Sequence, residues 1–271
     1  MRSLILIFLF FIAFNQSYAC IEDIHHSQAQ TEISSDQKII DAYKDRVAKE
    51  KGKKPKNYFH YYMGEDLTNN RLPYADVTFF LGRGTFGEVY RQYYSEGKTK
   101  VIKVYNTNLY PNGDMVDIPK RIDADIQTYE FLEQTFKKLS IENIRIPKVK
   151  KGEKPETLEI EDIPGINFYS FLVDERNDID LEVKLAMLRQ YKEASNKLVK
   201  HLESLGRTKR LHQVHSFTIF GRNREKAKVE LERIDFAGQT HNWNDDDFIS
   251  TKPNNFIVDS RDLSIYMADP G

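Results

Sequence analysis

The chain has 271 residues, which is enough to bury a sizeable core in one large domain or two small ones. Hydrophobic residues make up 40% and charged residues 30%, a composition that excludes disordered and fibrous proteins. The 40 Lys and Arg residues nearly balance 41 Asp and Glu residues, so no global basic field predicts binding to nucleic acid. A single cysteine excludes an intramolecular disulfide framework and a cysteine-cluster metal site.

The first residues have the pattern of an export signal. Arg2 precedes an unbroken apolar run, Leu4–Phe14, and Ser17 and Ala19 fit the −3 and −1 positions of a cleavage site. The run is too short for a bilayer, which requires about 20 helical residues. We therefore predict a signal peptide over residues 1–19 and a secreted mature chain with no transmembrane segment. Cys20 would then be the first mature residue, so a lipid anchor at this cysteine is an alternative.

Residues 20–75 are predicted to form an N-terminal extension. Ser35 and Asp36 can cap a short amphipathic helix. Its apolar face would consist of Ile39, Ile40, Tyr43 and Val47. The following stretch, residues 49–56, combines Gly, Pro and dense positive charge, which is typical of a solvated linker, with a phosphate-binding patch as the alternative.

From residue 76 onward the pattern predicts an α+β domain, with strands first and helices after. β-forming residues predict an antiparallel meander of three strands, Val77–Leu81, Glu88–Tyr94 and Lys100–Tyr105. Apolar residues at helical spacing predict two helices, residues 119–139 and 181–205. Further strands are expected at residues 145–149, 157–163, 255–258 and 263–268, the last two as a hairpin.

The loop between the first two strands contains Gly82, Gly84 and Gly87 in a GxGxxG pattern. In a dinucleotide-binding βαβ unit the third glycine opens a helix. Here it is followed by Glu88–Tyr94, which is rich in β-formers, so these glycines join two strands. Such a loop lets backbone amides close over nucleotide phosphates where a Cβ would block the approach.

Five further segments, in this chain order, resemble motifs of the protein-kinase-like superfamily. They are Val101–Val104 (the lysine strand), Leu158–Gly165 (the hinge), Asn167–Leu172 (the helix after it), Thr251–Val258 (the catalytic loop) and Ala268–Gly271 (D-F-G with Pro for Phe). The resemblance covers residues 76–271 and implies a two-lobed fold with an antiparallel-sheet N-lobe and a minimal, truncated helical C-lobe. Short bacterial effector kinases, which are similarly truncated, are the nearest model.

The resemblance implies a binding site for ATP and Mg²⁺. Val89 would cover an adenine face, and Lys103 would contact the α- and β-phosphates. Glu130 would pair with Lys103 and hold it extended, with Glu133 as the rival for this role.

The adenine and the metal would be held by later segments. Adenine would bond to backbone groups near Glu161 and Ile163 in the hinge-like segment. Asn255 and Asp269 would bind Mg²⁺, which neutralises charge during phosphoryl transfer.

The implied activity is transfer of the γ-phosphoryl group of ATP to a Ser or Thr hydroxyl of a protein. The partners would be ATP and a protein substrate, which for an effector belongs to a host cell, and no nucleic acid. A small-molecule phosphotransferase that acts on a sugar or alcohol is an alternative that the Ile163–Gly165 segment would also suit.

Two features depart from the family pattern. Ser250 stands where a kinase has the aspartate that orients the substrate hydroxyl, and a serine is no base near neutral pH without an activating partner. The chain also ends at Gly271, before any activation segment. A catalytically impaired pseudokinase that acts as a nucleotide- or protein-binding module is therefore the second interpretation.

A rival alignment of the D-F-G motif is also open. Arg233–Gly238 contains Asp235 in a D-F-x-G context. In the preferred alignment, residues 207–247 become an insertion before the catalytic loop, where a partner or substrate would be recognised.

Overall fold

The computed structural model describes residues 35–61, 65–66, 72–83, 87–106, 117–237 and 248–270. The predicted signal peptide, Cys20 and Gly84 lie outside these residues. An antiparallel sheet comes early in the chain and two of the helices come later, so the predicted α+β class is confirmed.

The N-terminal sheet has six strands in the order β1-β2-β3-β4-β7-β6, and every neighbouring pair is antiparallel. The strands are β1 (Glu65–Asp66), β2 (Val77–Arg83), β3 (Gly87–Tyr93), β4 (Thr99–Tyr105), β6 (Val149–Lys151) and β7 (Thr157–Ile160). The predicted meander corresponds to β2, β3 and β4, with ends that differ by one or two residues.

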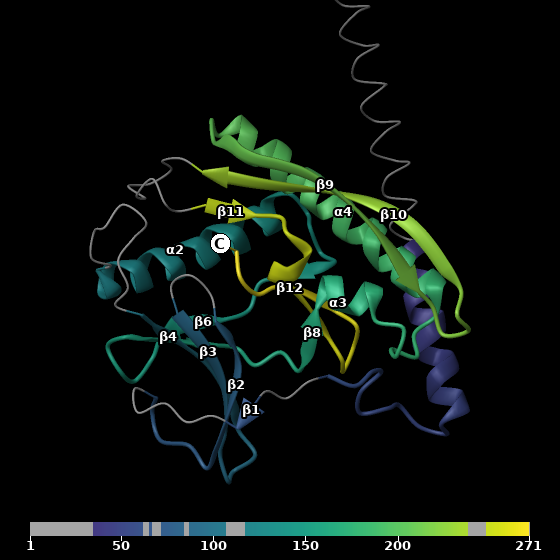
Figure 1. Ribbon diagram of the computed structural model, residues 1–271, viewed down its shortest axis with the longest axis horizontal. Helices are drawn as coiled ribbons and strands as arrows, with labels where there is room; N and C mark the ends of the chain where they lie inside the picture. Colours follow the sequence, from purple (N-terminus) through teal and green to yellow (C-terminus); the bar gives the residue numbers. More distant parts are fainter. Residues whose placement is uncertain are drawn as a thin grey trace, which may run out of the picture.

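Helix α2 (Ile118–Lys138) packs on one face of this sheet (Figure 1). The Asp117 side chain accepts a hydrogen bond from the Lys120 amide at 3.2 Å and caps the N-terminus. Ile122 and Tyr129 lie in one buried cluster with Tyr105 and other sheet residues. Burial of this apolar face holds the helix in place.

The second half of the chain contains α3 (Phe168–Val173), α4 (Leu181–Ser204) and a four-stranded sheet in the order β5-β13-β12-β8. Its strands are β5 (Ile144–Arg145), β8 (Gly165–Asn167), β12 (Phe256–Asp259) and β13 (Ile265–Met267). The predicted C-terminal hairpin is confirmed as β12 and β13, and a 3-10 turn, η1 (Pro253–Asn255), precedes it.

Residues 207–247, expected as an insertion, contain the longest hairpin of the described residues. Strands β9 (Thr208–Phe220) and β10 (Lys226–Ala237) pair antiparallel, and β11 (Phe248–Ser250) adds to β10. The hairpin lies along α4 (Figure 1). Ile219, Leu231 and Phe236 are buried in the main core, so the hairpin forms part of the core as well as part of the surface.

The helix predicted in the N-terminal extension is confirmed, because residues 35–50 are helical. Ile40, Tyr43 and Val47 are buried against the main core, as their spacing predicts. The buried carboxylate of Asp36 accepts hydrogen bonds from Arg189 on α4, which ties the extension to the domain. Among the described residues, no helix is long and apolar enough to cross a membrane.

The single strand predicted at residues 145–149 is wrong. Residues 144–145 form β5, which pairs parallel to β13, whereas β6 begins at Val149 in the other sheet. Pro147 lies between them, and its missing N–H together with its fixed φ interrupts a strand ladder. The strand predicted over 157–163 ends at Ile160, and the chain then runs without regular structure to Gly165.

Two glycines of the GxGxxG pattern, Gly82 in β2 and Gly87 in β3, differ in what surrounds them. A Cβ added to Gly87 would lie 2.4 Å from the Val104 carbonyl oxygen on β4, whereas one added to Gly82 would meet nothing within 4 Å. We expect Gly87→Ala to lower the free energy of unfolding by about 1–3 kcal/mol, because the sheet must shift to admit the methyl group. Gly82→Ala is the matched control and should change it by less than about 0.5 kcal/mol. Urea denaturation of both variants tests this, and equal stabilities would contradict it.

Candidate functional site

Three of the residues singled out in the sequence lie in a row across the N-terminal sheet. Gly82 is opposite Val89 in the β2–β3 ladder, and Val89 is opposite Lys103 in the β3–β4 ladder. Directly opposed residues of antiparallel strands share a face of the sheet. Val89 is half-buried and packs against the cluster beneath α2, so the Lys103 side chain projects from the face that α2 covers.

Lys103 is paired with Asp125 of α2. Its Nζ lies 2.9 Å from Asp125 Oδ2, Arg121 Nε lies 3.0 Å from Oδ1, and the Tyr105 hydroxyl donates to the same carboxylate. Burial alone would raise the pKa of Asp125, but the charges of Lys103 and Arg121 outweigh it, so the pKa lies below its usual value. The carboxylate is therefore ionised at neutral pH and fixes the Lys103 ammonium.

The expected partner of Lys103, Glu130, is not the one observed. Glu130 is exposed, and it follows Asp125 by five residues, which turns it by about 140° around the helix axis. The rival, Glu133, is exposed and paired with Lys137 at 2.8 Å. The prediction that a carboxylate of this helix pairs with Lys103 is confirmed, but the predicted residue, Glu130, lies on the solvent face of the helix and the observed one, Asp125, on its buried face.

A second polar side chain on the buried face of α2 reaches the C-terminal segment, residues 268–270. Tyr129 lies one helical turn after Asp125, and its hydroxyl donates to the Ala268 carbonyl oxygen. The pKa of Tyr129 is raised by burial and by the negative charges of Asp269 and Asp125. One face of α2 therefore contacts both Lys103, through Asp125, and the backbone next to Asp269.

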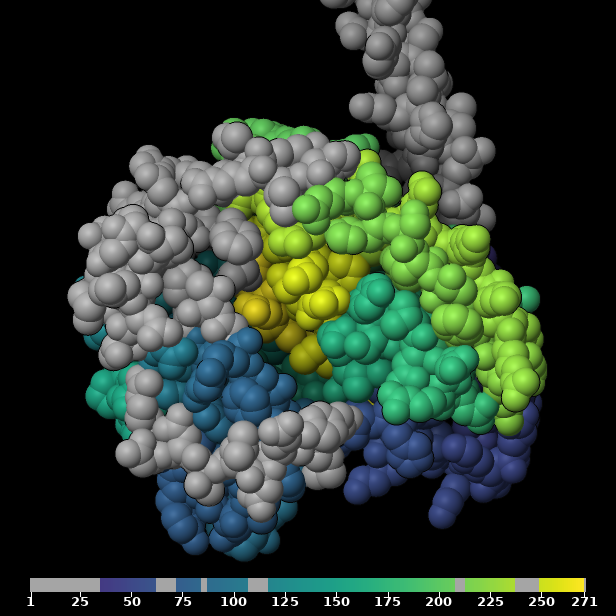
Figure 2. Space-filling view, viewed as in Figure 1, coloured from purple at the N-terminus to yellow at the C-terminus, as the bar shows by residue number. Residues whose placement is uncertain are grey.

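Asn255 and Asp269 belong to backbones that are joined directly. The amides of Ala268 and Asp269 both donate to the Asn255 carbonyl oxygen, at 2.9 and 3.1 Å. Asp269 is exposed and Asn255 is half-buried. The C-terminal segment lies at the centre of the face drawn in Figure 2, between the N-terminal sheet and the β9–β10 hairpin.

Ser250 has a carboxylate partner. It lies opposite Asp235 in the β10–β11 ladder, and its hydroxyl donates to Asp235 Oδ1. Arg233 Nη2 donates to Asp235 Oδ2 at 2.7 Å. Ser250 also donates its amide to the Pro270 carbonyl oxygen at 2.8 Å, next to Asp269. Asp235, the aspartate of the rival motif, thus lies beside Ser250, whereas Asp269 lies beside Asn255.

The loop between β11 and β12 is anchored from two sides. Tyr191 of α4 donates its hydroxyl to the Thr251 carbonyl oxygen. The Thr251 hydroxyl lies 3.1 Å from both the amide and the carbonyl oxygen of Ile234 on β10. Ser250, Thr251 and Pro253 are buried, so this loop is packed on its inner side.

The hinge-like segment is held by an ion pair with the sheet. Arg91 Nε lies 2.8 Å from Asp162 Oδ1, with both side chains buried, and its Nη2 donates to the Ile163 carbonyl oxygen. The Glu161 amide donates to the Lys148 carbonyl oxygen at 2.8 Å. Within the described part of the chain, no hydrogen bond uses the Glu161 carbonyl oxygen or the Ile163 amide.

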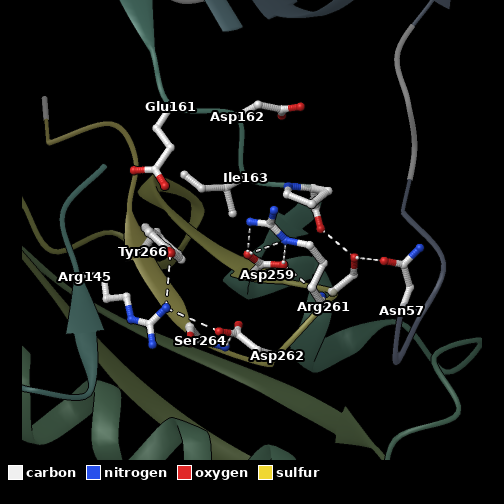
Figure 3. Close-up of polar contacts among 12 residues, drawn as sticks. Asn57, Arg145, Glu161, Asp162, Ile163, Asp259, Arg261, Asp262, Ser264 and Tyr266 are labelled. Atoms are coloured by element: carbon white, nitrogen blue, oxygen red, sulfur yellow. Dashed lines mark hydrogen bonds and ion pairs between the residues drawn. The ribbon is translucent and has the colours of Figure 1, made fainter. Parts of the chain in front are cut away.

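Figure 3 shows Glu161–Ile163 beside the turn between β12 and β13. The Ser260 hydroxyl in this turn donates to the Pro164 carbonyl oxygen at 2.6 Å. Arg261 forks onto Asp259, with Nη2 at 2.6 Å from Oδ2. The segment that leaves β7 is therefore fixed against the hairpin whose opposite end carries Asn255 and Asp269.

The described residues contain no group of three or more His, Cys, Asp or Glu side chains that could alone hold a metal ion. Searches of family models, curated proteins and solved structures find no match to this chain.

The roles of Asp125 and Tyr129 and the pairing of Asp235 with Ser250 are not among the features predicted from the sequence. A spacing signal existed for the helix, because Asp125 and Tyr129 share the buried stripe with Ile122 and Leu132 at i, i+3 and i+4 intervals. The contact between Asp235 and Ser250 depends on the register of β10 against β11, which the spacing of apolar residues within one segment does not reveal.

The ion pair predicts a difference between two acidic residues of α2. Asp125→Ala should lower the free energy of unfolding by about 3–5 kcal/mol, because it removes the carboxylate from the half-buried Lys103 and the buried Arg121. Glu130→Ala, on the exposed face, should change it by no more than about 0.5 kcal/mol. Chemical denaturation of the two variants measures this, and a larger loss for Glu130→Ala would be the contrary result.

The lowered pKa of Asp125 also predicts a pH dependence. The carboxyl is ionised at lower pH in the folded than in the unfolded chain, so its contribution is complete above its ordinary pKa of about 4 and is lost as pH falls through the folded value. The stability difference between the wild type and Asp125→Asn should therefore shrink between pH 5 and pH 2. Denaturation at several pH values tests this, with Glu130→Gln as control; a difference constant with pH would count against it.

Proposed function

We propose that this chain is an exported, minimal kinase-like protein that binds ATP with Mg²⁺ and transfers the γ-phosphoryl group to a Ser or Thr hydroxyl of a protein. The observation that carries the proposal is the inner face of α2. Asp125 on this face holds Lys103, and Tyr129 one turn later holds the backbone next to Asp269. These two contacts support a shared site for Lys103, a cation suited to phosphates, and Asp269, a carboxylate suited to a metal.

The N-terminal sheet supports the phosphate end of this site. Lys103 is held by Asp125, and Gly82 lies in the same row with open space where a side chain would be. Backbone amides and a fixed ammonium are groups that bind nucleotide phosphates. Within the proposal, the sheet with α2 corresponds to an N-lobe, and α3, α4 and the later hairpins correspond to a C-lobe.

The chemistry of Asn255 and Asp269 fits Mg²⁺. The ion takes oxygen ligands and is usually bound by one or two carboxylates together with substrate phosphates and waters. The exposed Asp269 carboxylate and the Asn255 side-chain amide come from segments joined by backbone hydrogen bonds. These two side chains would hold the ion, which would neutralise charge on the transferred phosphoryl group.

The hinge-like segment supports the adenine end. The Glu161 carbonyl oxygen and the Ile163 amide are one acceptor and one donor without partners among the described residues. An adenine edge offers the complementary donor and acceptor. The Arg91–Asp162 ion pair would keep this segment in position for such recognition.

A pseudokinase that binds nucleotide without transfer is the second candidate function. The observation that favours it is the serine at position 250, where the family pattern has an aspartate. Nucleotide binding is common to both functions, and phosphoryl transfer separates them.

The proposal predicts stabilisation by nucleotide. At 100 times its dissociation constant, ATP with Mg²⁺ should stabilise the protein by about 2.7 kcal/mol, or raise its Tm by about 5–10 °C. Lys103→Ala should abolish this shift, because the phosphates lose their fixed cation. Lys100→Ala, on the same strand and also paired with acidic side chains, is the matched control and should keep it.

Thermal denaturation with and without ATP and Mg²⁺ measures these shifts. A wild-type protein whose Tm does not respond to ATP with Mg²⁺ would rule out both candidate functions. A Lys103→Ala variant that responds as strongly as the wild type would place the nucleotide elsewhere.

A further inference from the structure

The carboxylate that the sequence lacks at position 250 is supplied from another strand. Asp235 on β10 faces Ser250 on β11, and a register shift in the β9–β10 ladder falls between Asp235 and Phe236. Such irregularities re-aim a side chain at the point where they occur. The long hairpin thus brings a buried carboxylate to the Ser250 hydroxyl.

We propose that Ser250 and Asp235 together accept the proton of the substrate hydroxyl, with Asp235 acting through Ser250. This inference rests on the proposed phosphoryl transfer and names the groups that would serve it. Ser250 would be the residue that touches the acceptor hydroxyl, and Asp235 would be the positioning residue that receives the proton. Arg233, paired with the other oxygen of Asp235, holds the carboxylate in place.

The hydrogen-bond inventory of Ser250 leaves room for this role. A hydroxyl has one donor and two acceptor lone pairs. The Ser250 proton goes to Asp235, and one lone pair accepts the Lys252 amide at 3.2 Å. The second lone pair has no partner among the described residues. Ser250 is buried, so an acceptor hydroxyl would have to enter the packed side of the loop to use it. The Ser250 amide is bonded to Pro270, the neighbour of the exposed Asp269, so the pair borders the proposed metal-binding residue.

The step balances as a proton relay coupled to substitution at phosphorus. The substrate oxygen forms a bond to the γ-phosphorus, and the bond from that phosphorus to the β–γ bridging oxygen breaks, leaving its electron pair on ADP. The substrate proton moves to Ser250 Oγ while the Ser250 proton moves to Asp235, which later releases it to solvent. Because Asp235 takes the original Ser250 proton as the substrate proton arrives, Ser250 gains no net proton, and the carboxylate is the base of the relay.

The test exchanges the two side chains. With casein as acceptor and ATP with Mg²⁺ as donor, Asp235→Asn should lower kcat by about 10²- to 10⁴-fold. The KM for ATP and the nucleotide-induced Tm shift should stay unchanged. The double variant Asp235→Ser/Ser250→Asp returns a carboxylate to the other side of the same contact and should recover at least tenfold of the lost rate.

Asp259→Asn is the matched control. Like Asp235, Asp259 is buried and paired with an arginine two residues away, but it lies at the end of β12 that is far from Asn255. It should keep the wild-type kcat. If Asp235→Asn has the kcat of the wild type, or if the double variant recovers none of the lost rate, the inference is overturned and the proposed function still stands. A wild type that binds ATP with Mg²⁺ but transfers no phosphate would overturn the inference in favour of the pseudokinase. A wild type that does not bind the nucleotide would overturn the proposed function itself.

Discussion

The inner face of α2 is the constraint on which the rest of the site depends. Two side chains one turn apart, Asp125 and Tyr129, join the N-terminal sheet to the C-terminal segment. The helix is held against the sheet by apolar burial, so both polar contacts are fixed in a region of low dielectric, where they are stronger than in water. Any shift of α2 would change the position of Lys103 and that of the backbone next to Asp269 together.

A second constraint acts on the loop that carries the chemistry in the proposed function. Ser250 and Thr251 are hydrogen-bonded to β10, to α4 and to Pro270. Asn255 accepts hydrogen bonds from the amides of Ala268 and Asp269. The β9–β10 hairpin provides several of these contacts and packs into the main core. The segment that the sequence predicts as an insertion is therefore part of the domain, because its strand β10 forms hydrogen bonds with Ser250 and Thr251.

Most regular elements could be predicted from the sequence, because their signals are local. The apolar spacing of residues 119–139 and 181–205 identifies α2 and α4 to within one residue. The β9–β10 hairpin also has a local signal, since Ala227, Val229 and Leu231 alternate with charged residues. Motif spacing takes no account of this alternation, so on motif spacing alone the segment is predicted only as an insertion.

The site was less predictable than the fold. Lys103, Val89 and Gly82 come from adjacent strands, so the meander alone brings them into a row. The partner of Lys103 depended on which helical face is buried, and exposure rather than residue type separates Asp125 from Glu130. The contact between Asp235 and Ser250 depends on the pairing of β10 with β11, and the three residues of β11 are too few to carry a hydrophobic pattern that would predict this pairing.

A crystal structure of the protein with Mg²⁺ and a non-hydrolysable ATP analogue would decide whether Lys103 and Asp269 serve one nucleotide site. We expect the analogue's phosphates within about 3 Å of Lys103 Nζ, the length of a hydrogen bond, with the metal ion on the Asp269 and Asn255 side chains. An analogue bound elsewhere on the molecule, or bound with its phosphates directed away from both Lys103 and Asp269, would contradict this expectation.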